Sequence, residues 1–141
     1  MRTMSTAEAM EFLAAGTRTG KLATVWPDGR PHVAPIWFVV EDGALVFNTW
    51  HTSVKARNLR ADPRAALAVD YQEPPFGYVI VEGTVELSDD LAEVRRIATV
   101  VGGRYMGADR AEEFGARNGV EGELACRLRI ERIIARDDIA D

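Results

Sequence analysis

Residues Phe47–Arg64 read F-N-T-W-H-T-S-V-K-A-R-N-L-R-A-D-P-R, which predicts a strand ending near Thr49 and then a short basic helix. The helix should begin near Ser53 and end before Pro63, because proline disfavours helical geometry in the residue ahead of it. From Ser53 to Arg64 there are four basic residues and one acidic residue, although the whole chain has 17 basic and 22 acidic residues. Helix starts hold anions readily, so this stretch predicts a site for a phosphorylated ligand.

Three sequential antiparallel strands are expected before this stretch. Their sequences are K-L-A-T-V-W (residues 21–26), P-H-V-A-P-I-W-F-V-V (residues 31–40) and A-L-V-F-N-T (residues 44–49). Turns rich in Pro, Asp and Gly separate them. Nearer the N-terminus, Ser5 and Glu8 have the spacing of a capping box, which predicts a short amphipathic helix that stops near Gly16.

Three more strands are expected after the basic helix, near residues 65–71, 78–87 and 123–135. Within the second of these, Gly83 predicts a bulge or a close approach of backbones. Asp89 and Asp90 can cap a helix with one apolar stripe, which should break at the glycine pair 102–103 before a polar segment at residues 108–117. We therefore expect a mainly β fold, a six-stranded antiparallel barrel with flanking helices, forming one domain over residues 1–141.

The composition excludes several classes of protein. The 141 residues have a formal net charge of −5, which argues against a nucleic-acid binder that needs a broad positive surface. No apolar run is long enough to span a bilayer, and the first residues lack the apolar core of a signal peptide, so we expect no membrane partner and a cytoplasmic location. The single cysteine, Cys126, cannot form an internal disulfide and should simply pack within a strand.

Common catalytic motifs are missing from the sequence. The two histidines, His32 and His51, are too few for a metal site built on several imidazoles. The chain also lacks the G-x-S-x-G of a hydrolase, the G-x-G-x-x-G of a dinucleotide fold and the G-x-x-x-x-G-K-[ST] of a phosphate loop. If the protein is an enzyme, a bound cofactor should therefore carry the chemistry, and we assign no catalytic side chain and no metal ligand.

Several motifs in a fixed order resemble a known superfamily. These are G-K-L-A-T-V-W-P-D-G-R-P-H-V-A-P-I-W-F, then F-N-T-x-x-x-S-V-K-A-R-N-L-R-A-D-P-R-A-A-L-A-V-D, and then P-P-F-G-Y-V-I-V-E-G. Together they resemble the split β-barrel flavin and deazaflavin oxidoreductases, the superfamily of pyridoxamine 5′-phosphate oxidase. The K-A-R-N-L-R-x-D-P-R signature is most similar to the branch that binds the deazaflavin coenzyme F420.

This resemblance implies an F420-dependent reductase that transfers a hydride from the reduced deazaflavin to an electron-poor small molecule. It also implies a homodimer with two cofactor sites at the subunit interface. Carried over by position, the residues implied for phosphate and linker are Asn48, Thr49, Ser53, Lys55, Arg57 and Asn58, those facing the ring are His32, Pro35 and Ile36, and those completing the pocket, from the partner chain or the same one, are Phe76 and Tyr78.

The chemistry of these residues also supports a phosphate site, because hydroxyl groups, the Lys55 ammonium and the planar guanidinium of Arg57 can all bind such an anion. The aromatic residues Trp37, Phe38 and Trp50 are expected in the core or at a dimer interface.

Two alternatives to an F420-dependent reductase stay open from the sequence. One is an enzyme of the same fold that uses flavin mononucleotide (FMN), since a phosphate site does not read the ring. The other is a non-catalytic protein that binds a deazaflavin or a tetrapyrrole. Oxidation of vitamin B6 phosphates is disfavoured, because the superfamily members that do this carry additional Arg and His residues, including near the C-terminus, where this chain ends A-R-D-D-I-A-D.

Overall fold

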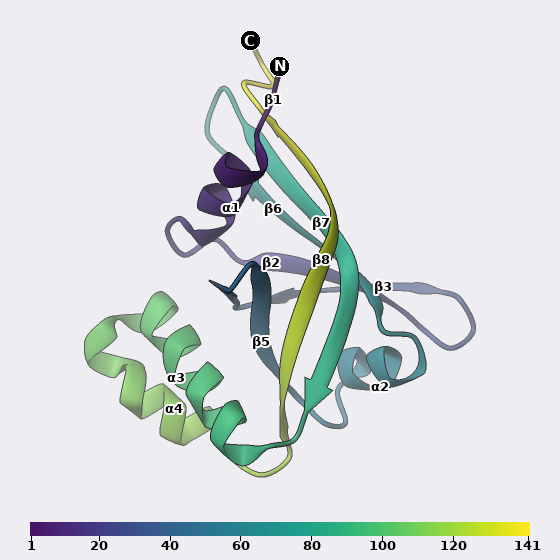
Figure 1. The fold of residues 1–141 in the computed structure, drawn as a ribbon, viewed down its shortest axis with the longest axis vertical. Helices are drawn as coiled ribbons and strands as arrows, with labels where there is room; N and C mark the ends of the chain where they lie inside the picture. The colour runs from purple at the N-terminus through teal and green to yellow at the C-terminus, as the bar shows by residue number, and fades with distance from the viewer.

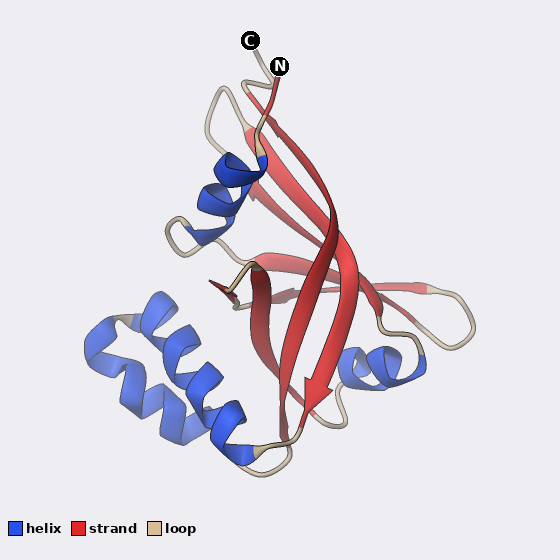
Figure 2. Ribbon diagram, viewed as in Figure 1, coloured by secondary structure: helices blue, strands red, loops and turns tan.

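The computed structural model describes residues 1–141 and is dominated by one antiparallel sheet (Figures 1 and 2). Seven strands follow the spatial order β3-β2-β6-β7-β8-β5-β4, and the short β1 pairs with β8. Three further strand pairs thus join segments that are distant in sequence, and the sheet curls around its own apolar face. The strands are β1 (Arg2–Thr3), β2 (Gly20–Val25), β3 (Pro31–Ile36), β4 (Val39–Glu41), β5 (Ala44–Trp50), β6 (Arg64–Tyr71), β7 (Gly77–Ser88) and β8 (Glu123–Asp137).

Four α-helices flank the sheet and confirm the predicted fold class. In Figure 1, α1 lies near the two chain ends, whereas the pair α3 and α4 lies at the opposite end of the sheet from them, away from α2. None of these helices is long and apolar enough to cross a membrane. The helices are α1 (Thr6–Ala14), α2 (Val54–Ala61), α3 (Leu91–Met106) and α4 (Ala111–Asn118), with a 3₁₀ turn, η1 (Ala108–Arg110), before α4.

Local sequence signals explain where the helices begin. Ser5 and Glu8 form both hydrogen bonds of a capping box at the start of α1, as predicted. Ser53 caps α2, which ends at Ala61 ahead of the Asp62-Pro63 pair. Asp90 caps α3 by accepting a hydrogen bond from the backbone of Ala92. The predicted boundaries at these three positions are confirmed.

The main core lies inside the curled sheet. Its strands alternate buried and less buried residues, as in β7, where Val79 and Val81 have no exposed surface. Leu13 of α1 and Leu59 of α2 close the two ends of this core. A second, smaller cluster forms where α3 packs on the outer side of β5 and includes Val46, Val94, Ile97, Val101 and Ala125.

The segment at residues 31–40 differs from the single strand that its sequence predicts. It breaks at Trp37 and Phe38 into β3 and β4, which lie at opposite ends of the strand order. Phe38 is fully buried, and its backbone bonds to side chains of α3 rather than to a neighbouring strand: its N–H donates to the Tyr105 hydroxyl and its carbonyl accepts from Arg104. This substitution for strand pairing accounts for the higher strand count, together with the short β1.

The glycine pair at residues 102–103 does not break the helix as predicted, because α3 continues to Met106. A Cβ added to Gly102 would overlap the Cβ of Phe114. The absence of side chains therefore lets α4 approach α3 closely, and the polar segment at residues 108–117 forms η1 and α4. By contrast, the expectation for Gly83 is confirmed: the β7–β8 register shifts between Glu82 and Gly83, and Gly83 lies against the carbonyl oxygen of Arg129.

Candidate functional site

A cavity of about 350 Å³ lies where the ends of β3 and β5 and the start of α2 approach α3 and α4. It brings together six of the residues singled out in the sequence, two from β3 and four from the passage between β5 and α2. Its lining residues are Pro35, Ile36, Trp37, Asn48, Thr49, Trp50, Ser53, Lys55, Val101, Asn118 and Glu123.

The start of α2 is held firmly on the end of β5. Ser53 is the N-cap, and its hydroxyl accepts a hydrogen bond of 3.1 Å from the backbone N–H of Ala56. The same hydroxyl lies 2.7 Å from the hydroxyl of Thr49, which is almost fully buried. The backbone N–H of Ser53 donates to the carbonyl of Trp50, at 2.9 Å. The chain therefore turns from strand to helix with both hydroxyl groups at the cavity wall.

Positive charge and free donors meet at this helix start. Lys55 lines the cavity, and no carboxylate oxygen lies within 4.0 Å of its ammonium group. The first turn of α2 carries no acidic side chain. The backbone N–H groups of Val54 and Lys55 have no acceptor, as expected in the first turn of a helix. This donor set of ammonium, hydroxyls and backbone N–H groups fits a phosphate.

Asn48 lines the cavity and is hydrogen-bonded to two neighbouring elements. Its side-chain amide donates to the carbonyls of Val94 in α3 and Leu124 in β8, each at 3.3 Å. These two bonds connect β5 with the helix that covers it and with its neighbouring strand. The position of Asn48 is thus fixed by the protein itself, with its amide oxygen left as the polar atom available to a ligand.

Glu123 introduces a negative group at the rim of the same cavity. It pairs with Trp50 in the β5–β8 register, and both residues also line an adjoining hollow beyond the rim. Burial raises the pKa of the Glu123 carboxyl above its ordinary value, while Lys55 and His51 oppose that rise. Because Lys55 and Glu123 line the same cavity with opposite charges, the two side chains together set the charge of this wall.

The cavity also has apolar and aromatic lining residues. Pro35 and Ile36 are among them, with Val101 from α3. Trp37 and Trp50 also line the cavity and are 38% and 44% exposed, whereas Phe38 is fully buried. The core position expected for Phe38 is thus confirmed, whereas the two tryptophans lie outside the core of the single chain and an interface position for them stays a prediction. A site lined by both polar and apolar side chains suits a phosphorylated ring compound.

Three other residues singled out in the sequence lie outside this cavity. His32 packs its ring edge-on against Trp26 at 5.8 Å, on the β2–β3 hairpin. Arg57 is exposed on α2 and makes no hydrogen bond or ion pair through its guanidinium. Asn58 is fully buried, and its amide donates to the hydroxyl of Thr24 at 3.0 Å. Asn58 therefore fastens α2 to β2 in this structure.

Phe76 and Tyr78 also lie away from the cavity within the same chain. Phe76 is 41% exposed and lines a separate hollow beside α1, together with Phe12, Arg18 and Tyr71. Tyr78 stands at the start of β7, opposite Arg136 of β8. A single copy of the chain does not bring these two residues to Lys55, so a contribution from them requires a second copy.

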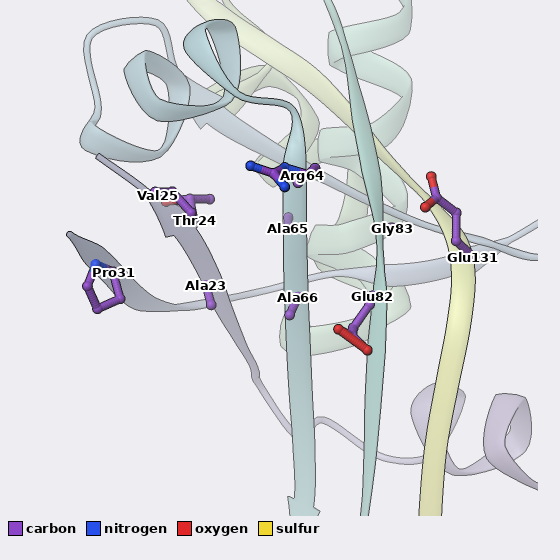
Figure 3. Close-up of a pocket in the computed structure, with 10 residues that line it drawn as sticks. All are labelled: Ala23, Thr24, Val25, Pro31, Arg64, Ala65, Ala66, Glu82, Gly83 and Glu131. Carbon is purple, nitrogen blue, oxygen red and sulfur yellow. The ribbon is translucent and has the colours of Figure 1, made fainter. Parts of the chain in front are cut away.

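A larger hollow of about 450 Å³ on the sheet surface has different chemistry (Figure 3). Figure 3 shows that its residues come from neighbouring strands, with Glu82 and Glu131 among them. Its one basic residue, Arg64, is already paired with Asp62 at 2.7 Å. Two carboxylates and one neutralised cation do not suit an anion. The cavity at the start of α2 is therefore the better candidate for a phosphorylated ligand.

Sequence reasoning did not assign five cavity residues to the site. Trp37 and Trp50 flank residues that it did assign, so their position beside the motifs was an available signal. Val101, Asn118 and Glu123 reach the cavity only through the packing of α3, α4 and β8. No local sequence pattern indicates that these three elements pack together beside the cavity.

Comparisons with known proteins agree with this architecture. A family model described as pyridoxamine 5′-phosphate oxidase matches residues 5–136. A crystal structure of a conserved hypothetical protein from Mycobacterium tuberculosis is 30% identical, with a TM-score of 0.84, and the match covers 96% of this chain and 86% of that one. A structure named F420 reductase is 28% identical, with a TM-score of 0.69 and coverage of 87% and 94%. A FAD-binding protein from Mesorhizobium loti, 24% identical with a TM-score of 0.71 and coverage of 95% of both chains, shares the fold. The predicted split β-barrel is confirmed.

Proposed function

Because the chain belongs to the pyridoxamine 5′-phosphate oxidase family, within the flavin and deazaflavin oxidoreductases, we propose that it is an F420-dependent reductase of an electron-poor small molecule. The choice of F420 within the superfamily is supported by the K-A-R-N-L-R-x-D-P-R signature and by the similarity to the structure named F420 reductase. In its reduced form, coenzyme F420 supplies a hydride from C5 of its ring.

The polar side chains of the cavity would hold the phosphate. Lys55 contributes its ammonium charge, and Thr49 and Ser53 contribute hydroxyl groups at the start of α2. The amide oxygen of Asn48 lies beside them and would bind the linker. Since Asn48, Thr49 and Ser53 are already fixed by bonds to the protein, little ordering of these three side chains is needed when the ligand binds.

The apolar side chains of the cavity would orient the ring. Pro35 and Ile36 form this wall at the end of β3, and Ile36 is 7% exposed. Apolar contact excludes water from the ring and holds it beside the bound acceptor, which is how an enzyme without a protein nucleophile accelerates a transfer.

The observation that carries this proposal is the unpaired Lys55 at the capped start of α2, facing the same cavity as Pro35 and Ile36. The test is a parallel titration of the apo-protein with coenzyme F420 and with FMN, followed by ligand fluorescence. Selective binding of F420, followed by reduction of a quinone or enone, supports the proposal. Selective binding of FMN would support the phosphate site but would show that the cofactor is FMN rather than F420. Tight F420 binding without turnover of any acceptor would instead favour a carrier protein.

We also propose that the protein acts as a homodimer. The observation in favour is that Phe76 and Tyr78 lie far from the cavity within one chain, so that their implied role at the ring needs a partner copy. Large exposed apolar side chains on the sheet, such as Val33 at 64%, offer surface for such a contact. Light scattering at micromolar concentration should give the mass of two chains, and a monomer mass would contradict this proposal.

A further inference from the structure

Trp37 presents a free aromatic surface to the cavity. One face of its indole is covered by the ring of Tyr105 from α3, with the centroids 5.0 Å apart and the planes within 4° of parallel. Phe114 of α4 supports the stack at 6.2 Å. Trp37 is nevertheless 38% exposed and lines the cavity, so the stack with Tyr105 leaves part of it open to a ligand.

The position of this indole is fixed by two residues of α3. The Tyr105 hydroxyl donates to the carbonyl of Arg18 at 3.0 Å and accepts from the N–H of Phe38 at 3.3 Å. The guanidinium of Arg104 donates to the carbonyls of Phe38 at 2.6 Å and Leu13 at 2.8 Å. The backbone immediately after Trp37 is thus held from two sides, and the indole cannot turn away without leaving its stack with Tyr105.

We infer that Trp37 is the stacking wall for a flat, conjugated ring bound in this cavity, and that Tyr105 and Arg104 are its positioning residues. The inference rests on the proposed function in one respect, since it takes this cavity as the ligand site. Indole offers a large electron-rich face, and parallel offset contact with a flat ring is the arrangement that aromatic systems prefer. A rigid wall loses little conformational entropy on binding, which makes it suited to selecting flat ligands over bulky ones.

The ring can belong to the cofactor or to a second flat molecule, and the probes distinguish these sources. Coenzyme F420 and FMN carry both a ring and a phosphate, whereas the naphthoquinone menadione is a flat ring without a phosphate. We expect Trp37→Leu to weaken the binding of at least one of these probes by about tenfold or more, as measured by calorimetry. A loss with the coenzymes assigns the wall to the cofactor ring, and a loss with menadione alone assigns it to the second molecule.

Conservative and control variants separate stacking from structural damage. Trp37→Phe keeps an aromatic face and should retain affinity within about threefold. Tyr105→Phe keeps the stacked ring but removes both hydroxyl bonds. We expect its affinity for the probe to lie between the affinities of Trp37→Phe and Trp37→Leu. Trp26→Leu alters an indole outside the cavity and should leave the affinity unchanged. Equal binding by the wild type and Trp37→Leu for all three probes would overturn the inference.

A second measurement does not depend on removing Trp37. The chain has three tryptophans, so a Trp26→Phe, Trp50→Phe double variant emits from Trp37 alone. A bound ring in contact with the indole should quench most of that emission, and saturation without quenching would overturn the inference. Lys55→Ala run in parallel tests the phosphate site separately. If menadione binds through Trp37 while neither coenzyme binds, the proposed function fails and the stacking wall stands.

Discussion

The hydroxyl oxygens of Thr49 and Ser53 lie 2.7 Å apart, and this hydrogen bond joins the end of β5 to the N-cap of α2. Ser53 also accepts from the backbone of Ala56, so one hydroxyl serves the strand and the helix together. The phosphate site proposed at this point is therefore part of the framework of the protein. A change here should affect stability as well as binding.

The first prediction concerns the stability contributed by this cap. Ser53→Ala should lower the free energy of unfolding by about 1–2 kcal/mol, because it removes the N-cap acceptor and the partner of Thr49. Chemical denaturation followed by circular dichroism measures the difference. Thr52→Ala, one residue earlier and exposed, is the matched control and should change stability by less than about 0.5 kcal/mol. Equal losses in the two variants would contradict the assigned cap.

The second prediction compares two cations of the same helix. Lys55→Ala should weaken binding of the phosphorylated coenzyme by about 1.5–3 kcal/mol, the usual contribution of a hydrogen bond to a charged group. Arg57→Ala should weaken it less than threefold, because its side chain is exposed and lies outside the cavity. Fluorescence titration of both variants tests this contrast. A larger effect of Arg57 would move the phosphate to the outer face of α2.

The contrast between Lys55 and Arg57 also shows how much of the site could be predicted from the sequence. The stretch from Asn48 to Lys55 is contiguous, so its residues must lie close together in any fold, and five of its eight residues line the cavity. Residues two apart on a helix point in different directions, however, and the charge pattern alone does not say which side faces a ligand. The positions of Glu123 and Asn118 in the cavity could not be predicted from the sequence, because only tertiary packing brings them there.

The same distinction applies to the fold. Alternation, turn residues and caps are local signals, and they gave most strands and the helix starts correctly. The break at Trp37 and Phe38 could not be found in this way, because the groups that replace the strand bonds come from Arg104 and Tyr105 in a distant helix. Gly102 was likewise predicted to break its helix, because the sequence alone does not show its contact with a distant residue. In the packed structure, the missing side chain of Gly102 leaves room for Phe114.

The third prediction concerns the bulge in β7. Gly83→Ala should cost at least about 3 kcal/mol of unfolding free energy, because the added Cβ overlaps the backbone carbonyl of Arg129, which cannot move without breaking the β7–β8 pairing. Gly29→Ala provides the comparison, since Gly29 has a φ of +91° but no atom within 4 Å of the added Cβ. Its cost should be only about 1–2 kcal/mol from the backbone conformation. Thermal and urea denaturation of the two variants test this order, and the reverse order would contradict the close approach at Gly83.

The fourth prediction concerns acid stability through Glu41. The carboxylate of Glu41 contacts Arg96 at 2.7 Å and Arg127 at 2.8 Å, and 22% of its side chain is exposed. Hydrogen bonds from Arg96 and then Arg127 lower the pKa of Glu41 to about 2 from the model-compound value of 4.5. A carboxyl whose pKa is lower in the folded state binds its proton more weakly there than in the unfolded chain. Its stabilising contribution is therefore complete above pH 4.5 and is lost as the pH falls toward 2.

Glu41→Gln isolates this contribution, because glutamine keeps the size of the side chain and cannot titrate. The unfolding free energy of the wild type should exceed that of the variant by on the order of 2 kcal/mol at neutral pH, and the difference should shrink steadily as the pH falls from 4.5 to 2, where Glu41 is neutral in the unfolded chain and half protonated in the folded one. Urea denaturation at several pH values measures the two curves. Glu112 is an exposed residue of α4 without an ion pair. The free energy of unfolding of Glu112→Gln should therefore follow that of the wild type at every pH, since no bond is lost. A difference between the wild type and Glu41→Gln that stays constant down to pH 2 would mean that packing, rather than the charge held between Arg96 and Arg127, accounts for the role of Glu41.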